Sequence, residues 1–327
     1  MPNKKIKVCV IGAGNMGKYH LRNYDRLPEA NLVGMADVNP ESIELAKQYK
    51  IKHYSDFKKM LDELKPEAVS IAVPTPYHFA VAYEVLSRGI NCLLEKPIAS
   101  TVEEADKLIN LAKKKKLVFT IGHIEQYNPL ITKLKDMINH NSLGEVSSVI
   151  CKRVGGFPAV EPKTDVIIDL AVHDIDLISF LLNKNPSNIS SHGSRTHHSH
   201  KIDSAEILLD YGDASGFIQA NWITPVKIRT IAITGSNGYI EGNYITQELE
   251  YYKHNLPKKV GNNFSTFVNR VGEPEKEIIK VKFSEPLYIE LHNFLSRINN
   301  NNQVHLVDPI NARNALELAL KAAEGYE

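Results

Sequence analysis

The stretch Ile6-Lys-Val-Cys-Val-Ile-Gly12-Ala-Gly14-Asn-Met-Gly17 joins a short apolar run to three glycines with the spacing G-x-G-x-x-G. The apolar run predicts a strand, and the residues after the glycines predict a helix. In this strand-turn-helix setting the glycines form the dinucleotide-binding fingerprint. Gly12 would make the tight turn, Gly14 would admit a pyrophosphate, and Gly17 would let helix and strand pack closely. Asn15 and Met16 would lie at the helix N-terminus, where free N–H groups favour an anion.

An acidic residue follows the second predicted strand. That strand covers residues 31–36 and ends at Asp37. A carboxylate at this place accepts hydrogen bonds from a ribose hydroxyl and repels a 2′-phosphate, so the sequence predicts NAD rather than NADP as cofactor. The alternative is that Asp37 only forms the turn before Val-Asn-Pro40.

Strand and helix patterns alternate as far as Gly122. They predict an α/β fold in which residues 1–122 form a Rossmann-type doubly wound parallel sheet, with ligands at the carboxyl ends of its strands. Two such ends read Pro74-Thr75-Pro76-Tyr77-His78 and Glu95-Lys96-Pro97. Because Pro97 cannot continue a strand, Lys96 is expected to project at the ligand edge. The alternative is an exposed lysine without a role.

The pattern changes at residue 123, which predicts a second domain of the α+β type over residues 123–327. Residues 189–252 contain β-like runs separated by turn signals, as in an antiparallel or mixed sheet. Two helices are predicted near the end, over residues 286–298 and 312–323.

The stretch Val166 to Leu182 is apolar almost all round, which predicts a helix buried on most faces. Asp169, His173 and Asp176 are spaced i, i+4 and i+7, so they would share one stripe of that helix. Buried ionisable groups need polar partners. The stripe is therefore either a buried salt-bridge network or part of a reactive site.

Composition excludes several classes of protein. The 327 residues can form two domains, and 43% hydrophobic with 24% charged residues is ordinary for a globular protein. A net charge of +1 favours no nucleic-acid partner, and no apolar run reaches the ~20 residues of a membrane span.

The cysteines and histidines do not predict a metal site. Cys9, Cys92 and Cys151 have no metal-ligand spacing, which predicts buried reduced thiols in a cytoplasmic protein. Four histidines, His192, His197, His198 and His200, lack a helix that would converge them, so a surface loop is the favoured interpretation.

Three motifs together resemble the Gfo/Idh/MocA oxidoreductase family over essentially the whole chain. They are the glycine fingerprint, Glu95-Lys96-Pro97, and Asp169-x-x-x-His173, in this order. The resemblance implies a Rossmann domain followed by a domain built on an open-faced mixed sheet, which often forms the interface of a homodimer or homotetramer. It also implies that the last helix packs near the first domain.

The resemblance also implies site residues. Lys96 matches the lysine that contacts the reacting hydroxyl, and Asp169 and His173 match its acid-base partners. Asp176 matches a frequently acidic position that orients the substrate or His173. Four residues match positions that line the cofactor: Pro74, Thr75, His78 and Glu95. A histidine has an ordinary pKa suited to a base, and a lysine can stabilise an alkoxide, although Lys96 and His173 can exchange these roles.

Residues 122–129, 166–176 and 222–229 resemble the branch of the family that acts on nucleotide sugars. Gln126 differs from that branch, which commonly has arginine there, and residues 242–247 differ too. The resemblance implies oxidation of the C3 hydroxyl of UDP-N-acetylglucosamine to a 3-keto sugar, for use by an aminotransferase. The candidate contacts of a UDP-sugar are His123, Tyr127, Asn128 and Arg153. The alternatives are another sugar or polyol such as an inositol, reversible oxidation during glycoside cleavage, and a non-catalytic NAD-sensing protein.

Overall fold

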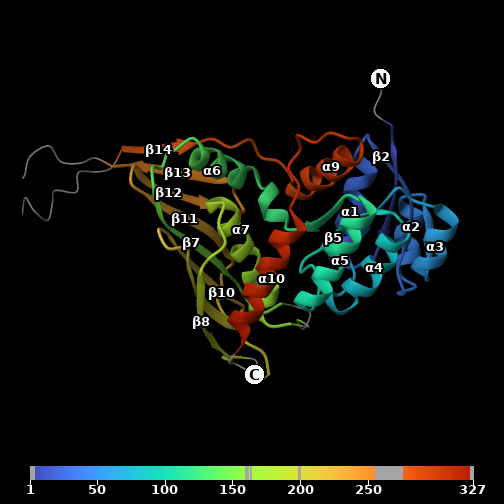
Figure 1. The fold of residues 1–327 in the computed structure, drawn as a ribbon, viewed down its shortest axis with the longest axis horizontal. Coiled ribbons are helices and arrows are strands. Elements are labelled where there is room, and N and C mark those ends of the chain that lie inside the picture. The colour runs from blue at the N-terminus through green and yellow to red at the C-terminus, as the bar shows by residue number, and fades with distance from the viewer. Residues whose placement is uncertain (1–3, 159–161, 163, 198–199, 255–274, 325–327) are drawn as a thin grey trace, which may run out of the picture. The chain divides into compact units, whose positions relative to one another are not determined.

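A computed structural model describes residues 4–158, 162, 164–197, 200–254 and 275–324 (Figure 1). The chain folds into two compact units. The first contains residues 1–127 and 284–317, and the second contains residues 128–283 and 318–327.

The described strands of the first unit form one parallel sheet in the order β3-β2-β1-β4-β5-β6. The strand order reverses between β1 and β4, and ligands bind at such a switch point. The predicted doubly wound parallel sheet is therefore confirmed. Its strands are β1 (Ile6–Ile11), β2 (Ala30–Ala36), β3 (Lys52–Tyr54), β4 (Ala68–Ile71), β5 (Asn91–Glu95) and β6 (Phe119–Gly122).

Helices cover this sheet, and a late segment of the chain contributes one of them. Alternate side chains of β1 (Ile6, Val8 and Val10) belong to the same buried core as Leu21 of α1 and Phe294 of α9. The described helices of the unit are α1 (Asn15–Arg26), α2 (Ser42–Gln48), α3 (Phe57–Leu64), η1 (Thr75–Tyr77), α4 (His78–Ser87), α5 (Val102–Lys115), η2 (Ile124–Tyr127) and α9 (Pro286–Ile298). The boundary between the units falls within α10 (Pro309–Ala323), at residue 317.

The second unit contains a mixed sheet, as predicted. The described strands have the order β14-β13-β12-β11-β7-β10-β9-β8, in which β7 and β10 run parallel and the other neighbours antiparallel. They are β7 (Val146–Val154), β8 (Asn188–Ser194), β9 (Ser204–Asp210), β10 (Ser215–Asn221), β11 (Ile228–Gly235), β12 (Gly238–Asn243), β13 (Glu248–Lys253) and β14 (Glu275–Ile279).

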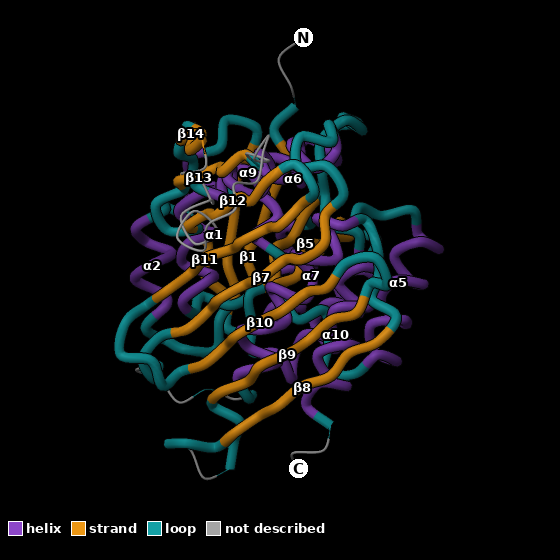
Figure 2. The backbone as a smooth tube through the Cα atoms, turned by 90° about the vertical axis from the view of Figure 1, so that its left-hand side faces the viewer, coloured by secondary structure: helices purple, strands orange, loops and turns teal. Residues whose placement is uncertain are grey.

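One face of this sheet supports two helices, α6 (Pro129–Asn139) and α7 (Val172–Leu182). Figure 2 shows the opposite face toward the viewer, with both helices behind the strands. Gly216 of β10 permits close packing, because a Cβ there would lie 3.2 Å from two side-chain carbons of Ile178 on α7.

The structure differs from the sequence-based expectation at a few elements. The predicted continuous helix over residues 166–182 begins instead with a π-helical turn, η3 (Ile167–Ala171), and continues as α7. Helix α2 and the strands β3 and β14 were not predicted, because each is too short to show a hydrophobic period. No helix among the described residues is long and apolar enough to cross a membrane.

Candidate active site

The glycine loop after β1 has a shape that other residues would disrupt. Gly12 has φ +92°, and a Cβ there would lie 2.5 Å from the carbonyl oxygen of Ala72. A Cβ on Gly17 would lie 1.9 Å from the Gly12 carbonyl oxygen, whereas a Cβ on Gly14 would meet no atom within 4 Å. The first and third glycines therefore allow the backbone to pack, and the second leaves open space where a pyrophosphate can approach.

Helix α1 begins directly behind this loop without a side-chain cap. Gly14 is its N-cap residue, and its first turn contains no acidic side chain. Gly14 and Asn15 are exposed, and Met16 is half-buried. The first N–H groups of the helix and its dipole are therefore available to an anion, as the cradle for a dinucleotide requires.

Asp37 lies at the end of β2 and contacts the glycine loop. Its Oδ2 accepts a hydrogen bond from Ala13 N–H, and its Oδ1 accepts one from Asn39 N–H at 2.7 Å. A carboxylate has about four lone-pair positions, so it can still accept a bond from a ribose hydroxyl. Asp37 therefore lies beside the glycine loop, and its contact with a ribose hydroxyl stays a prediction.

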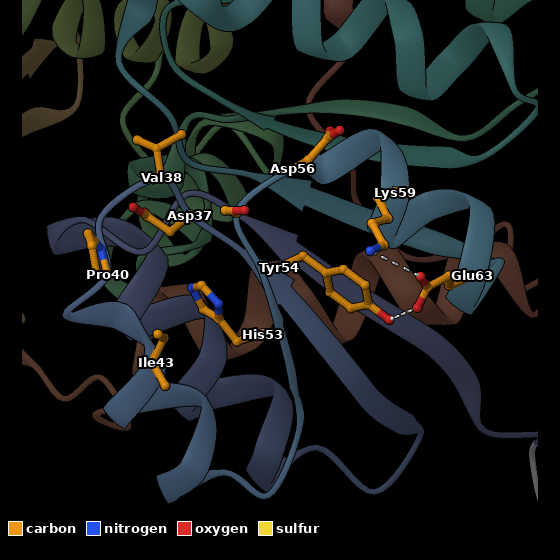
Figure 3. Close-up of a pocket in the computed structure, with 10 residues that line it drawn as sticks. Asp37, Val38, Pro40, Ile43, His53, Tyr54, Asp56, Lys59 and Glu63 are labelled. Carbon is orange, nitrogen blue, oxygen red and sulfur yellow. Dashed lines mark hydrogen bonds and ion pairs between the residues drawn. The ribbon is translucent and has the colours of Figure 1, made fainter.

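Asp37 also forms part of the wall of a pocket with a volume of about 400 Å³ (Figure 3). The wall carries three carboxylates (Asp37, Asp56 and Glu63) and one ammonium group (Lys59). Tyr54 donates a hydrogen bond to Glu63 at 2.8 Å. This excess of negative charge is unfavourable for the 2′-phosphate of NADP.

The end of β4 is joined to the Glu95–Pro97 segment by His78. Pro74 and Thr75 begin η1 directly after β4, and His78 is the first residue of α4. The His78 ring is only 1% exposed. Its Nδ1 lies 2.7 Å from the Pro97 carbonyl oxygen, and its Nε2 lies 2.8 Å from that of Val73. Burial lowers the pKa of His78, while the two carbonyl groups oppose this effect.

Glu95 is the last residue of β5, and Lys96 follows it. The Glu95 carboxylate is buried, and its Oε1 lies 2.8 Å from Nε2 of the fully buried His20 on α1. The predicted cofactor contacts of His78 and Glu95 stay predictions, since the contacts found for these two side chains are with the protein itself.

The start of the 166–182 segment is organised by Asp165. Its Oδ1 accepts hydrogen bonds from Ile167 N–H and Ile168 N–H, both at 3.1 Å. Asp169 then lies in the π-helical turn, and His173 is the second residue of α7. Both side chains are half-buried, whereas Asp176 is 4% exposed. Single π-helical turns occur frequently at functional sites, so this turn supports the choice of Asp169 and His173.

Arg153, a predicted substrate contact, is anchored within the second unit. Its Nε and one terminal nitrogen donate to the two oxygens of Asp174 at 2.8 and 2.9 Å, and both side chains are buried. The Arg153 guanidinium also lies over the Tyr244 ring, 5.4 Å from its centre. The geometry supports a role in attaching α7 to β7, and contact with substrate stays a prediction.

The other predicted substrate contacts are also largely buried. His123 is 1% exposed and Tyr127 is 2% exposed, and the Tyr127 hydroxyl accepts a hydrogen bond from Val307 N–H. Asn128 caps α6 by accepting a bond from Leu130 N–H, and it donates one to the Tyr244 carbonyl oxygen. Gln126, which stands where the nucleotide-sugar branch commonly has arginine, has its Oε1 2.8 Å from Nε2 of His305.

The sequence did not single out His20 or Asp174. Each is an ionisable residue on a helix and is followed by a buried apolar residue. An ionisable residue within an apolar stretch of a helix is the sequence signal that could have identified it. No group of three His, Cys, Asp or Glu side chains within the described ranges is placed to hold a metal ion. The predicted surface loop is wrong for His192, which lies in strand β8, and His198 of the histidine cluster lies outside those ranges.

The parallel sheet, the uncapped glycine turn and Asp37 together are the features of a class of proteins, the NAD-binding proteins with a Rossmann fold. A family model described as "Oxidoreductase family, NAD-binding Rossmann fold" matches residues 6–123, and a second, "GFO/IDH/MocA C-terminal domain", matches residues 131–241. The chain belongs to the Gfo/Idh/MocA family, and NAD is its cofactor.

Two relatives match nearly the whole chain. UDP-N-acetylglucosamine 3-dehydrogenase from Acidithiobacillus ferrooxidans is 27% identical over 98% of this chain and 97% of its own. Its solved structure has a TM-score of 0.84 over 98% of this chain and 97% of that one. The scyllo-inositol 2-dehydrogenase (NAD(+)) of Bacillus subtilis is 23% identical over 98% of this chain and 94% of its own.

Another solved structure shares the fold alone. Levoglucosan dehydrogenase, in complex with NADH and levoglucosan, is 18% identical with a TM-score of 0.83, and the match covers 99% of this chain and 98% of that one.

Proposed function

We propose that this protein is an NAD-dependent dehydrogenase that oxidises the C3 hydroxyl of UDP-N-acetylglucosamine to a 3-keto nucleotide sugar. The observation that supports this substrate is the end-to-end similarity to the Acidithiobacillus ferrooxidans enzyme in both sequence and fold. A 3-keto sugar is a carbonyl substrate for transamination, so an aminotransferase is the proposed consumer of the product.

In this proposal, side chains of the protein accept the proton of the substrate hydroxyl and stabilise the negative charge that develops on its oxygen. Bound NAD supplies the hydride acceptor. His173 takes the proton from the hydroxyl, and the Lys96 ammonium donates a hydrogen bond to the same oxygen, which stabilises the alkoxide. Asp169, four residues before His173, orients the imidazole or the substrate. The reverse assignment, with Lys96 as the base, is the alternative.

We also propose that the two parts of the chain bind different ligands. Residues 1–122 would bind NAD, and residues 123–327 would bind the sugar and associate with further copies. The described cysteines are free thiols in buried positions, which suits a reducing cytoplasm.

A second candidate function is oxidation of a polyol such as an inositol. The similarity to scyllo-inositol 2-dehydrogenase covers nearly all of both chains, which favours this alternative. Gln126 also differs from the arginine expected of an enzyme for nucleotide sugars.

The direct test is the formation of NADH at 340 nm from NAD and UDP-N-acetylglucosamine, with glutamate and a matching aminotransferase added to remove the product. We expect turnover with the nucleotide sugar and none with free N-acetylglucosamine. Lys96→Ala and His173→Ala should each lower kcat by at least about 100-fold, because proton transfer and alkoxide stabilisation typically contribute that much.

Matched controls separate chemistry from folding. His140→Ala and Lys52→Ala replace exposed residues of the same types in the same units, and both should retain full turnover. NADH formed from an inositol but not from the nucleotide sugar would refute the proposed substrate and leave the class, an NAD-dependent dehydrogenase, unchanged. Full turnover in both Lys96→Ala and His173→Ala would refute the assigned roles.

A further inference from the structure

Two buried histidines hold the segment Glu95-Lys96-Pro97 from both ends. His20 is 0% exposed and His78 is 1% exposed. An imidazole loses its hydration when it is buried and therefore needs specific polar partners. The partners of these two rings lie at residue 95 and at residue 97, on either side of Lys96.

His20 fixes the Glu95 side. Its Nε2 lies 2.8 Å from Glu95 Oε1. The same carboxylate lies against the backbone of β6, because a Cβ on Gly122 would come within 3.0–3.2 Å of its three terminal atoms. Glu95 is therefore confined between an imidazole and a glycine, and any larger residue at position 122 would displace it. His20 lies on α1, the helix that begins at the glycine loop.

His78 fixes the Pro97 side. Its two ring nitrogens lie 2.7 and 2.8 Å from the carbonyl oxygens of Pro97 and Val73. The ring thus bridges the end of β4 and the residue after Lys96. Carbonyl oxygens only accept hydrogen bonds, and a neutral imidazole has one N–H, so an aliphatic side chain of similar size would remove the donor from a buried carbonyl oxygen.

These contacts connect Lys96 to the two loops of the dinucleotide site. We propose that His20 and His78 are positioning residues that hold the backbone of Lys96 in a fixed place relative to the glycine loop and to Pro74 and Thr75. This inference rests on the proposed role of Lys96 and deepens it. Neither histidine needs to touch substrate or cofactor, since each acts through the backbone on which the lysine is carried.

The chemical environment of Lys96 tests this inference without any sugar substrate. The folded protein is treated briefly with acetic anhydride, and acetylation of Lys96 is measured by peptide mass spectrometry relative to the exposed Lys52. The variants are His20→Leu, which removes the contact to Glu95, and His20→Gln, whose amide nitrogen can occupy the place of Nε2. His78→Leu and His78→Asn form the second pair. NADH affinity is measured in parallel by fluorescence titration.

We expect the relative acetylation rate of Lys96 to change by at least about threefold in both leucine variants, with the Lys52 rate unchanged. In His20→Gln it should stay within about twofold of the parent. A small displacement of a reacting group can cost up to about 100-fold in rate, so kcat on the true substrate should fall by about 10- to 100-fold in the leucine variants. His78→Asn can keep the contact at Nδ1 only, so it should lie between the parent and His78→Leu.

The inference is overturned if Lys96 reacts at its parental rate in folded leucine variants. If those variants do not fold, the acetylation rates of Lys96 in His20→Gln and His78→Asn test the inference instead. A rate within about twofold of the parent in His20→Gln, together with a change of more than about twofold in His78→Asn, supports the inference, and any other combination overturns it. Inactivity toward UDP-N-acetylglucosamine would instead refute only the proposed substrate, because acetylation does not require turnover.

Discussion

At the scale of single residues, Asp37 should decide between NAD and NADP. Its carboxylate contacts the glycine loop and shares a pocket wall with Asp56 and Glu63. Asp37→Asn removes the charge and one of the two acceptor oxygens. Hydrogen bonds to charged groups contribute ~1.5–3 kcal/mol, so NADH should bind about 10- to 100-fold more weakly, while NADPH loses less.

Fluorescence titration with NADH and NADPH measures this change of preference. Asp56→Asn is the matched control, because asparagine can still cap α3 by accepting the bond from Lys58 N–H. If the ratio of NADH affinity to NADPH affinity falls in Asp56→Asn and stays constant in Asp37→Asn, the general negative charge of the pocket, and not Asp37, selects NAD over NADP.

Glu290 should make the stability of the protein depend on pH. Its carboxyl group on α9 is fully buried, and no described residue forms a hydrogen bond with either oxygen. Burial, with a smaller contribution from Glu95, raises the pKa of Glu290 well above its usual value.

The sign of the effect follows from the raised pKa. The unfolded chain loses the Glu290 proton near pH 4.3, whereas the folded protein retains it to higher pH, so stability falls by ~1.4 kcal/mol per pH unit between the two pKa values. Glu290→Gln should therefore raise Tm relative to the parent more at pH 8 than at pH 5, by about 4 °C or more. Thermal unfolding at both pH values measures this, with the exposed Glu41→Gln as control. An equal shift at both pH values would show that Glu290 ionises normally.

At the scale of elements, the buried pair Arg153–Asp174 attaches α7 to β7. Removing one partner leaves a buried charge unpaired, so Asp174→Asn should destabilise the second unit by about 3–5 kcal/mol. Replacing both partners by apolar residues, in Arg153→Met with Asp174→Leu, should recover most of that loss. Urea unfolding, followed by Trp222 fluorescence in the same unit, measures both. A double variant as unstable as Asp174→Asn would show that the pair does not act as a unit.

The same elements show what the sequence could predict. The glycine fingerprint and the β-branched runs contain their own local signals, so the parallel sheet and NAD as the cofactor could be predicted from them. The partner of Arg153 is separated from it by 21 positions and lies on another element, so pairing depends on how α7 packs on β7. The π-helical turn at Asp169 depends on the cap at Asp165 and on packing, and no local period in the sequence indicates it.

At the scale of the whole molecule, the open face of the mixed sheet carries a row of apolar side chains. Leu208, Phe217 and Ile150 are direct cross-strand neighbours on β9, β10 and β7, and they are 48%, 39% and 46% exposed. The adjacent row on this face is polar and contains Glu206, Gln219 and Lys152. An apolar centre with a polar border is the composition of a protein–protein interface.

We therefore expect the protein to be a homodimer or homotetramer that associates through this face. Phe217→Glu would place a carboxylate in the apolar row. Because burying an unpaired charge costs several kcal/mol, the Kd of the oligomer should rise by at least about 100-fold. Mass photometry at about 10 nM would detect the loss of mass, because a complex with a Kd of about 1 nM stays mostly associated at that concentration, whereas one weakened about 100-fold mostly dissociates. Gln219→Glu is the matched control, because it adds the same charge two residues away on the same strand, in the polar row between Lys152 and Glu206. Unchanged mass in Phe217→Glu would exclude the face as the interface, because a carboxylate cannot remain unpaired at the centre of a tight contact.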